Sequence, residues 1–194
     1  MSEAVETVNE LPGVVSDLTT RFDGCVVQET ADGIPTVWVG RDDIQDVMRF
    51  LKHGADHPYE LLFDVSGIDE RVRQHRDGQP DSDFTVFYHL MSLSGNSDLR
   101  VKVALSENDA RLKSVESIYP SANWYEREAY DMFGVSFEEH PNLRRILTPP
   151  LWEGHPLRKD HPARATEMDP YRFTPEFQDA QQEALKFVPE EWGM

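Results

Sequence analysis

The segment Asn123-Trp-Tyr-Glu-Arg-Glu-Ala-Tyr-Asp-Met-Phe-Gly134 predicts a complete helix with its own start and stop signals. Asn123 suits the N-cap, and Glu126, three residues later, can reach back to the cap backbone. Gly134 suits the C′ position, where a left-handed residue ends a helix. With about 3.6 residues per turn, the apolar side chains of the segment fall on one stripe. This stripe consists of Tyr125, Ala129, Met132 and Phe133.

Four charged residues of this segment are the first candidates for chemistry. Glu126 and Glu128 flank the apolar stripe about 160° apart, so they do not converge on one substrate as a general acid–base pair would. Arg127 and Asp131 are spaced i,i+4, and we expect them to pair on the outward face of the helix. We therefore favour a structural role, in which the carboxylates pair with arginines of the following segment or of a partner protein.

Three histidines downstream leave a metal site as an alternative. No two of them have a spacing such as His-x-x-x-His, which places two ligands on one face of a helix. Each stands directly before a proline, where a hydrogen-bonded turn histidine is the simpler interpretation. The three are His140, His155 and His161.

Beyond Gly134 the character of the sequence changes. Residues 140–165 contain five prolines, which exclude a long helix or a central strand, yet they are too apolar for a disordered linker. They carry five basic and two acidic residues, a net charge of +3, whereas the whole chain carries −17. We predict an extended docking arm over 135–173 that lies on another surface. A short helix and tail over 174–194 follow, with Thr174 as N-cap and Pro175 at the first position.

Residues 1–134 are predicted to form a platform domain. Apolar residues at positions 14, 18 and 22 indicate a first short helix. A second helix is expected over 44–53, with acidic residues at its start and Gly54 just after its end. The runs 25–28 and 36–39 predict a β-hairpin around the turn Asp32-Gly33.

Three more strands are expected in this platform, at 59–65, 84–93 and 99–105. The second suits a central strand covered on both faces, and the third suits a strand with one solvated face. A further helix is predicted from Ser106 to Pro120, because apolar residues recur there at helical spacing. The expected fold class is α+β, with a mixed, largely antiparallel sheet flanked by helices.

Composition restricts the class of protein. The chain of 194 residues is 39% hydrophobic, enough for a core, and it has no run of eighteen apolar residues that would span a bilayer. Its net charge of −17 argues against nucleic acid as a partner, because phosphate binding needs lysine and arginine. The single Cys25 cannot form an internal disulfide or hold an iron–sulfur cluster. The first residues lack a secretory signal, so we expect a cytoplasmic location.

Two motifs together resemble a known family. The first comprises Glu126-Arg127-Glu128, Asp131-Met132-Phe133, His140, Arg144 and Ile146-Leu147, and the second is Gly154-His155-Pro156-Leu157-Arg158-Lys159-Asp160. Their spacing is similar to that in the C subunit of bacterial NADH:quinone oxidoreductase, the 30-kilodalton subunit family of respiratory complex I. Residues 185–194 resemble the junction at which the C and D subunits are fused into one polypeptide. Two interpretations stay open here: a part of such a fused polypeptide, or a separate subunit whose tail meets the D subunit without a covalent link.

This resemblance implies a non-redox subunit of the peripheral arm, with no catalytic centre and no cofactor of its own. NADH, FMN, the iron–sulfur clusters and quinone belong to other subunits of such a complex. The resemblance also implies docking to the D subunit, which carries the quinone site, near the I and B subunits. Its place would be the cytoplasmic side of the bacterial inner membrane, peripheral to the bilayer.

The two motifs supply the expected interface. We expect the carboxylates of the helix to fix the start of the arm through Arg144 and Arg145. Arg158 and Lys159 are expected to meet carboxylates of the D subunit. Two alternatives are a homologous subunit of a membrane-bound hydrogenase-type complex and a stand-alone metal-dependent enzyme that uses the three histidines. The expected interface residues are Glu126, Arg127, Glu128, Asp131, Phe133, His140, Arg144, Arg145, Gly154, His155, Pro156, Arg158, Lys159 and Asp160.

Overall fold

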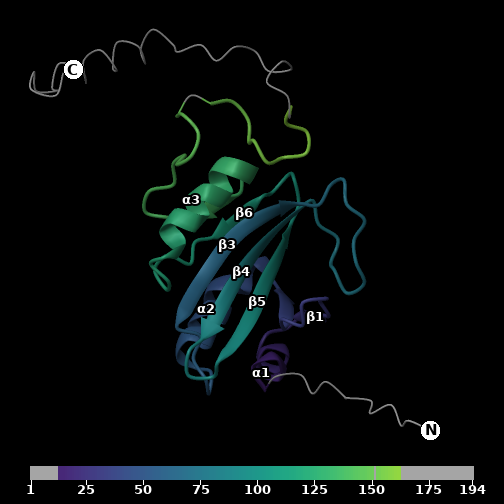
Figure 1. Cartoon of the computed structure of the whole chain (residues 1–194), viewed down its shortest axis with the longest axis vertical. Helices are drawn as coiled ribbons and strands as arrows, with labels where there is room; N and C mark the ends of the chain where they lie inside the picture. The colour runs from purple at the N-terminus through teal and green to yellow at the C-terminus, as the bar shows by residue number, and fades with distance from the viewer. Residues whose placement is uncertain (1–12, 151, 163–194) are drawn as a thin grey trace, which may run out of the picture.

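A computed structural model describes residues 13–150 and 152–162 of the chain, shown in Figure 1. The helices and strands of this part form the α+β fold expected from the sequence. The predicted C-terminal helix, its cap Thr174 and the remainder of the arm lie outside the described residues. The elements are α1 (Gly13–Arg21), β1 (Val26–Gln28), β2 (Thr36–Val39), the 3₁₀ helix η1 (Arg41–Asp43), α2 (Ile44–His53), β3 (Leu61–Asp69), β4 (Phe84–Ser92), β5 (Ser97–Leu105), β6 (Arg111–Lys113), α3 (Ala122–Phe133) and β7 (Ser136–Glu138).

The main sheet has five strands in the order β1-β2-β5-β4-β3. All neighbours are antiparallel except β2 and β5, which run parallel and pair Val39 with Val103. The predicted hairpin of 25–28 and 36–39 is confirmed as β1 and β2, and Gly33 in its turn has a φ of 71°. The β4–β5 hairpin turns at Asn96, whose φ of 45° is a left-handed conformation that asparagine tolerates.

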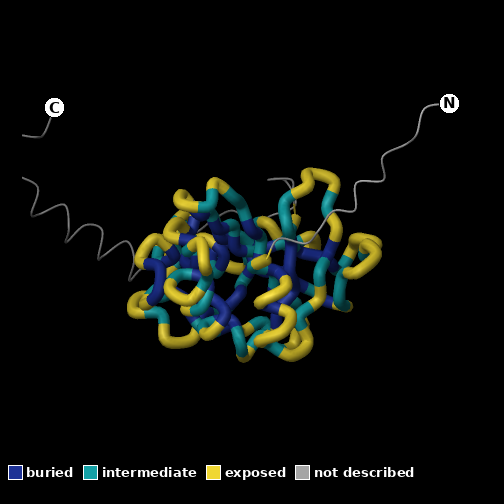
Figure 2. The backbone as a smooth tube through the Cα atoms, turned by 90° about the horizontal axis from the view of Figure 1, so that it is seen from below, coloured by how far each residue is buried: buried dark blue, intermediate teal, exposed yellow. Residues whose placement is uncertain are grey.

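One hydrophobic core lies between the sheet and the helices. Apolar residues of α1, α2 and α3 join the inward-facing residues of the strands in a single cluster, and Figure 2 shows the buried chain gathered inside the exposed loops. Strand β5 alternates buried and half-buried residues, as predicted for one solvated face. Strand β4 is central, but its expected cover on both faces is wrong from Phe87 onward, because alternate residues there are only half-buried.

The helix predicted from Ser106 to Pro120 is wrong. This stretch instead contains turns and the short strand β6, which pairs in parallel with β7 and sets Leu112 opposite Phe137. Leu112, Val115 and Ile118 are buried as their apolar character indicates. Leu112 lies in β6 and the other two lie in the turns after it, so a helical spacing of buried residues arises here without a helix. A pairing partner about 25 residues later therefore determines this local structure.

Candidate docking site around helix α3

Helix α3 buries three charged side chains, which a stable protein does only when each has partners. Glu126 and Asp131 are fully buried and Arg127 is 8% exposed. The expected outward pairing of Arg127 with Asp131 is therefore wrong, since both residues point into the protein and bond to other groups. Glu128 is exposed on the opposite side of the same helix.

Asp131 anchors the chain that follows the helix. One carboxylate oxygen accepts the backbone N–H groups of Ile146, Leu147 and Thr148 at 3.0, 2.8 and 2.9 Å. The other accepts Nη1 of Arg145 at 2.8 Å and the Thr148 hydroxyl. Burial raises the pKa of Asp131, but these hydrogen bonds outweigh it and hold that pKa below its ordinary value. We call Asp131 and residues 145–148 the latch.

Arg127 holds the same turn from the other side. Its Nε donates to the Arg144 carbonyl at 3.1 Å and its Nη2 to the Arg145 carbonyl at 3.4 Å. The guanidinium also lies over the ring of the exposed Trp124, 5.3 Å from the centroid. Arg144 thus contributes its backbone to the latch, while its side chain is exposed. Of the two arginines expected to meet the helix, only Arg145 pairs with a carboxylate there.

The second motif covers the C-terminal end of α3, where the last carbonyls of a helix lack partners within it. The backbone N–H of Leu157 donates to Met132 O at 3.1 Å, and Nε of Arg158 donates to Phe133 O at 2.6 Å. The helix ends at Gly134 in a left-handed conformation, as predicted, with a φ of 77°. A Cβ at Gly134 would lie 2.6 Å from side-chain nitrogens of both Arg158 and His155, so this close approach also requires glycine.

A second buried aspartate ties the same motif to the end of β3. Asp69 accepts the backbone N–H of Lys159 at 2.8 Å and Nη2 of Arg71 at 2.6 Å. Arg71 also pairs with Asp160 at 3.1 Å. Hydrogen bonds from Arg71 lower the pKa of Asp69 to about 2, despite the opposing effect of burial. We call Asp69, Arg71 and residues 158–160 the clasp.

Two cations of the clasp lie over one aromatic ring. The guanidinium groups of Arg71 and Arg158 lie 4.9 and 4.8 Å from the centroid of the buried Phe84 ring. Contacts of this kind stabilise a cation over a ring face by about 0.5–2 kcal/mol. Sequence reasoning missed Asp69 and Arg71, because they lie about 90 positions before the motif residues that they bind.

Glu126 belongs to neither anchor. Its carboxylate accepts the Ser114 hydroxyl at 2.5 Å and the Val115 N–H at 2.8 Å, which fixes α3 against the chain leaving β6. Burial raises the pKa of Glu126 to about 7, although both hydrogen bonds act in the opposite direction. The predicted capping by Asn123 and Glu126 is wrong, since the N-cap is Ser121 and Glu126 is used elsewhere.

The three histidines form separate backbone or ring contacts. His140 accepts the Asn142 N–H at Nδ1 and contacts Asn123 O through Nε2 at 3.1 Å, which makes Nε2 the donor. His155 contacts Asp131 O through Nδ1 at 3.0 Å, and His161 lies beside the Trp152 ring. Within residues 13–150 and 152–162, no three His, Cys, Asp or Glu side chains are grouped to hold a metal ion.

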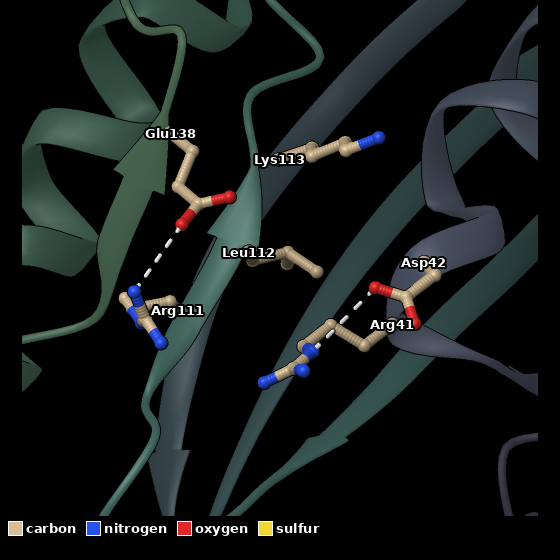
Figure 3. A pocket seen from close by; sticks show the side chains of 6 residues that line it. All are labelled: Arg41, Asp42, Arg111, Leu112, Lys113 and Glu138. Carbon is tan, nitrogen blue, oxygen red and sulfur yellow. Dashed lines mark ion pairs between the residues drawn. The ribbon is translucent and has the colours of Figure 1, made fainter.

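A hollow of about 60 Å³ lies away from α3, between η1 and the β6–β7 pair. Four of its charged side chains form two ion pairs, drawn in Figure 3: Arg111 with Glu138, 3.7 Å apart, and Arg41 with Asp42, 3.8 Å apart. Cofactor sites commonly enclose about 300–1,000 Å³, so this hollow is too small for one. Its lining residues are Arg41, Asp42, Arg111, Leu112, Lys113 and Glu138.

The fold and its two anchors define a class of protein: an α+β domain on which buried aspartates hold a proline-rich segment against the end of one helix. Residues 37–167 match the family described as "Respiratory-chain NADH dehydrogenase, 30 Kd subunit". The chain belongs to this family, and the resemblance found in its two motifs is confirmed.

Curated relatives share most of the chain. The C/D subunit of NADH-quinone oxidoreductase from Psychrobacter cryohalolentis is 58% identical over 96% of this chain and 32% of the relative. The same protein of Methylococcus capsulatus is 54% identical over 98% and 33%, and that of Acinetobacter baumannii is 59% identical over 93% and 30%. The chain therefore spans about a third of the length of the curated relatives it matches.

Two solved structures share the fold. The trypsin-resistant fragment (1–134) of Nqo5 is 29% identical, with a TM-score of 0.59 over 68% of this chain and 97% of that fragment. A chain of the membrane-bound sulfane sulfur reductase, an archaeal respiratory membrane complex, is 22% identical, with a TM-score of 0.61 over 84% and 95%. Among the described helices, none has the length and apolar character needed to cross a membrane.

Proposed function

We propose that this chain is the C part of a fused C/D subunit of NADH:quinone oxidoreductase and acts as a non-redox docking part of its peripheral arm. Family membership and the C/D relatives support this proposal. In it, the oxidation of NADH and the reduction of quinone take place at cofactors of other subunits. The chain would lie on the cytoplasmic side of the bacterial inner membrane and meet the D, I and B subunits.

The docking role is supported by the way in which the latch and the clasp fix the inner side of the arm and leave its outer side exposed. They hold residues 145–148 and 157–160 through inward backbone and side-chain groups, and several side chains on the outer side stay exposed. Figure 1 shows this segment lying over one end of α3. Leu147 and Leu157 are exposed, as are Arg144 and Lys159, so the arm presents apolar and cationic groups to solvent. A surface that combines apolar and cationic side chains suits a partner surface with apolar and acidic side chains.

Purification from native membranes tests this proposal. A tag on the chain should recover the B and I subunits and inhibitor-sensitive NADH–quinone reductase activity, with the D sequence on the same polypeptide. Recovery without these proteins, or with hydrogenase subunits, would overturn the assignment.

A charge-reversal pair tests the arm itself. Arg144→Glu should lower the amount of assembled complex several-fold, because it opposes an acidic partner. Arg49→Glu makes the same charge change on the exposed face of α2, where Arg49 pairs with Asp46 and hydrogen-bonds Gln45, and should leave assembly unchanged. Equal assembly in both variants would contradict the docking role of the arm.

A further inference from the structure

Three large apolar side chains are exposed together where the sheet is farthest from the clasp. Leu61 and Phe63 in β3 are 43% and 58% exposed, and Leu93, just after β4, is 63% exposed. Leu61 pairs with Met91, the Phe63 ring packs against His89 two positions before Met91, and the Leu93 N–H binds the carboxylate of Glu60 beside Leu61, so the three residues are neighbours. Asp69 of the clasp is at the other end of β3, about 26 Å away at about 3.3 Å per residue. This patch is therefore separate from the arm.

A β-bulge creates the patch. In a regular strand Leu61, Phe63 and Val65 would all lie on one face. The register between β3 and β4 shifts between Leu62 and Asp64, so Val65 is turned into the core while Leu61 and Phe63 stay outside. The Phe63 ring lies against His89 with its centroid 5.4 Å away. Bulges are a common means of directing a side chain at a functional surface.

The position of the patch makes its exposure unusual. Strand β3 is the last strand of the sheet. Proteins usually protect such edges with charged residues or proline, because an apolar edge promotes association. Here the edge strand has an exposed Phe and Leu on its outer face, and exposed apolar groups gathered in this way mark interaction sites.

The charges around the patch define the partner. Glu60, Asp64 and Asp98 surround it, and in the described part of the chain none of them pairs with a lysine or arginine. The Glu60 carboxylate accepts the Leu93 N–H at 3.0 Å, and the Asp98 carboxylate hydrogen-bonds His89 at 3.0 Å. Carboxylates around an apolar centre complement an apolar surface edged by basic side chains.

We propose that Leu61, Phe63 and Leu93 form a second docking surface, which binds a basic, apolar segment of a partner protein. This inference rests on the proposed function, in which that partner is another subunit of the same complex. It adds a contact at the β3–β4 end of the domain, where the arm does not reach. A partner held at two ends of the sheet resists rotation about either contact.

Thiol labelling of the assembled complex tests the proposal. The variants are Phe63→Cys in the patch and Arg49→Cys on the exposed face of α2, away from both the patch and the clasp. The unmodified chain measures the background from Cys25. In the purified complex, a maleimide reagent should label position 63 at least tenfold more slowly than position 49, and both should label equally after denaturation. Equal labelling in the intact complex would overturn the proposal.

A charge test identifies the kind of partner. Asp64→Lys should reduce the recovered complex several-fold, whereas Asp56→Lys, an exposed acidic residue before β3, should not. A photoreactive residue at position 63 should cross-link to a peptide rich in lysine or arginine from another subunit. A cross-link to a second copy of this chain, or equal recovery of both variants, would overturn the proposal. Failure to recover any other protein of the complex would instead refute the proposed function.

Discussion

Replacing Asp131 with asparagine tests the latch most directly, because it removes one charge and hardly changes the volume. The Asp131 side chain is fully buried, and its ion-pair partner Arg145 is 15% exposed. The amide oxygen can still accept the N–H groups of residues 146–148, but its NH₂ group then faces two donors, Arg145 and the Thr148 hydroxyl. Breaking a buried ion pair on one side costs about 3–5 kcal/mol. We expect this loss to appear as local opening of the arm.

Native-state hydrogen exchange measures that opening at the three amides that the carboxylate binds. Since about 1.4 kcal/mol corresponds to a factor of ten, Asp131→Asn should accelerate their exchange on the order of 10²–10⁴-fold. Glu128→Gln makes the same chemical change on the exposed side of α3 and should leave the rates unaltered. Unchanged exchange in Asp131→Asn, or equal acceleration in the control, would refute the reasoning.

The wild-type latch also has a definite pH dependence. The folded pKa of Asp131 is lowered from its ordinary value of 3.8, so the stabilisation is present above that value and is lost as the pH falls toward the lower one. Asp131→Asn should lack this dependence.

Three further predictions concern Glu126, Gly134 and Arg71. The pKa of Glu126 rises from 4.5 to about 7 on folding, so its stabilisation is present below pH 4.5 and is lost as the pH passes about 7. In urea titrations the stability of Glu126→Gln relative to wild type should therefore rise by about 3 kcal/mol between pH 4 and pH 8, and a constant difference would contradict this. Gly134→Ala should lower the free energy of unfolding, measured in urea, by about 1–3 kcal/mol more than Gly24→Ala does. Gly24 has a similar positive φ, but a Cβ there would have nothing within 4 Å. Arg71→Lys should accelerate tryptic cleavage in the clasp, because lysine cannot make the two-pronged contact with Asp69, and an unchanged cleavage rate would count against the clasp.

Elements whose partners are local could be predicted from the sequence. Helix α2 has buried residues at 44, 47, 48 and 51, which is the stripe that its periodicity indicates. The strands β1 and β2 are joined by a short turn, and the pairing is recognisable within 14 residues. The family resemblance is likewise carried by two contiguous motifs, and the matching family confirms it.

Contacts between distant positions could not be predicted in this way. Residues 111–113 form a strand instead of the predicted helix because they pair with residues 136–138. The spacing of three apolar residues gives no indication of that distant partner. Asp131 binds backbone N–H groups, which every residue except proline carries, so no side-chain pattern at 146–148 indicates the latch. The remaining assignments of the two motifs to partner contacts stay predictions.

Because β2 pairs in parallel with β5, it cannot complete its pairing until β5 has been synthesised. Val39 meets Val103, which is made 64 residues later, and at about 5–20 residues per second a ribosome needs about 3–13 s to add them. Hairpins such as β1–β2 and β4–β5 form in microseconds once their residues emerge. The second edge of β2 therefore has no partner in this sheet until β5 has been made, seconds after β1 and β2. Synthesis rate, rather than hairpin formation, thus limits how early β2 can become an interior strand.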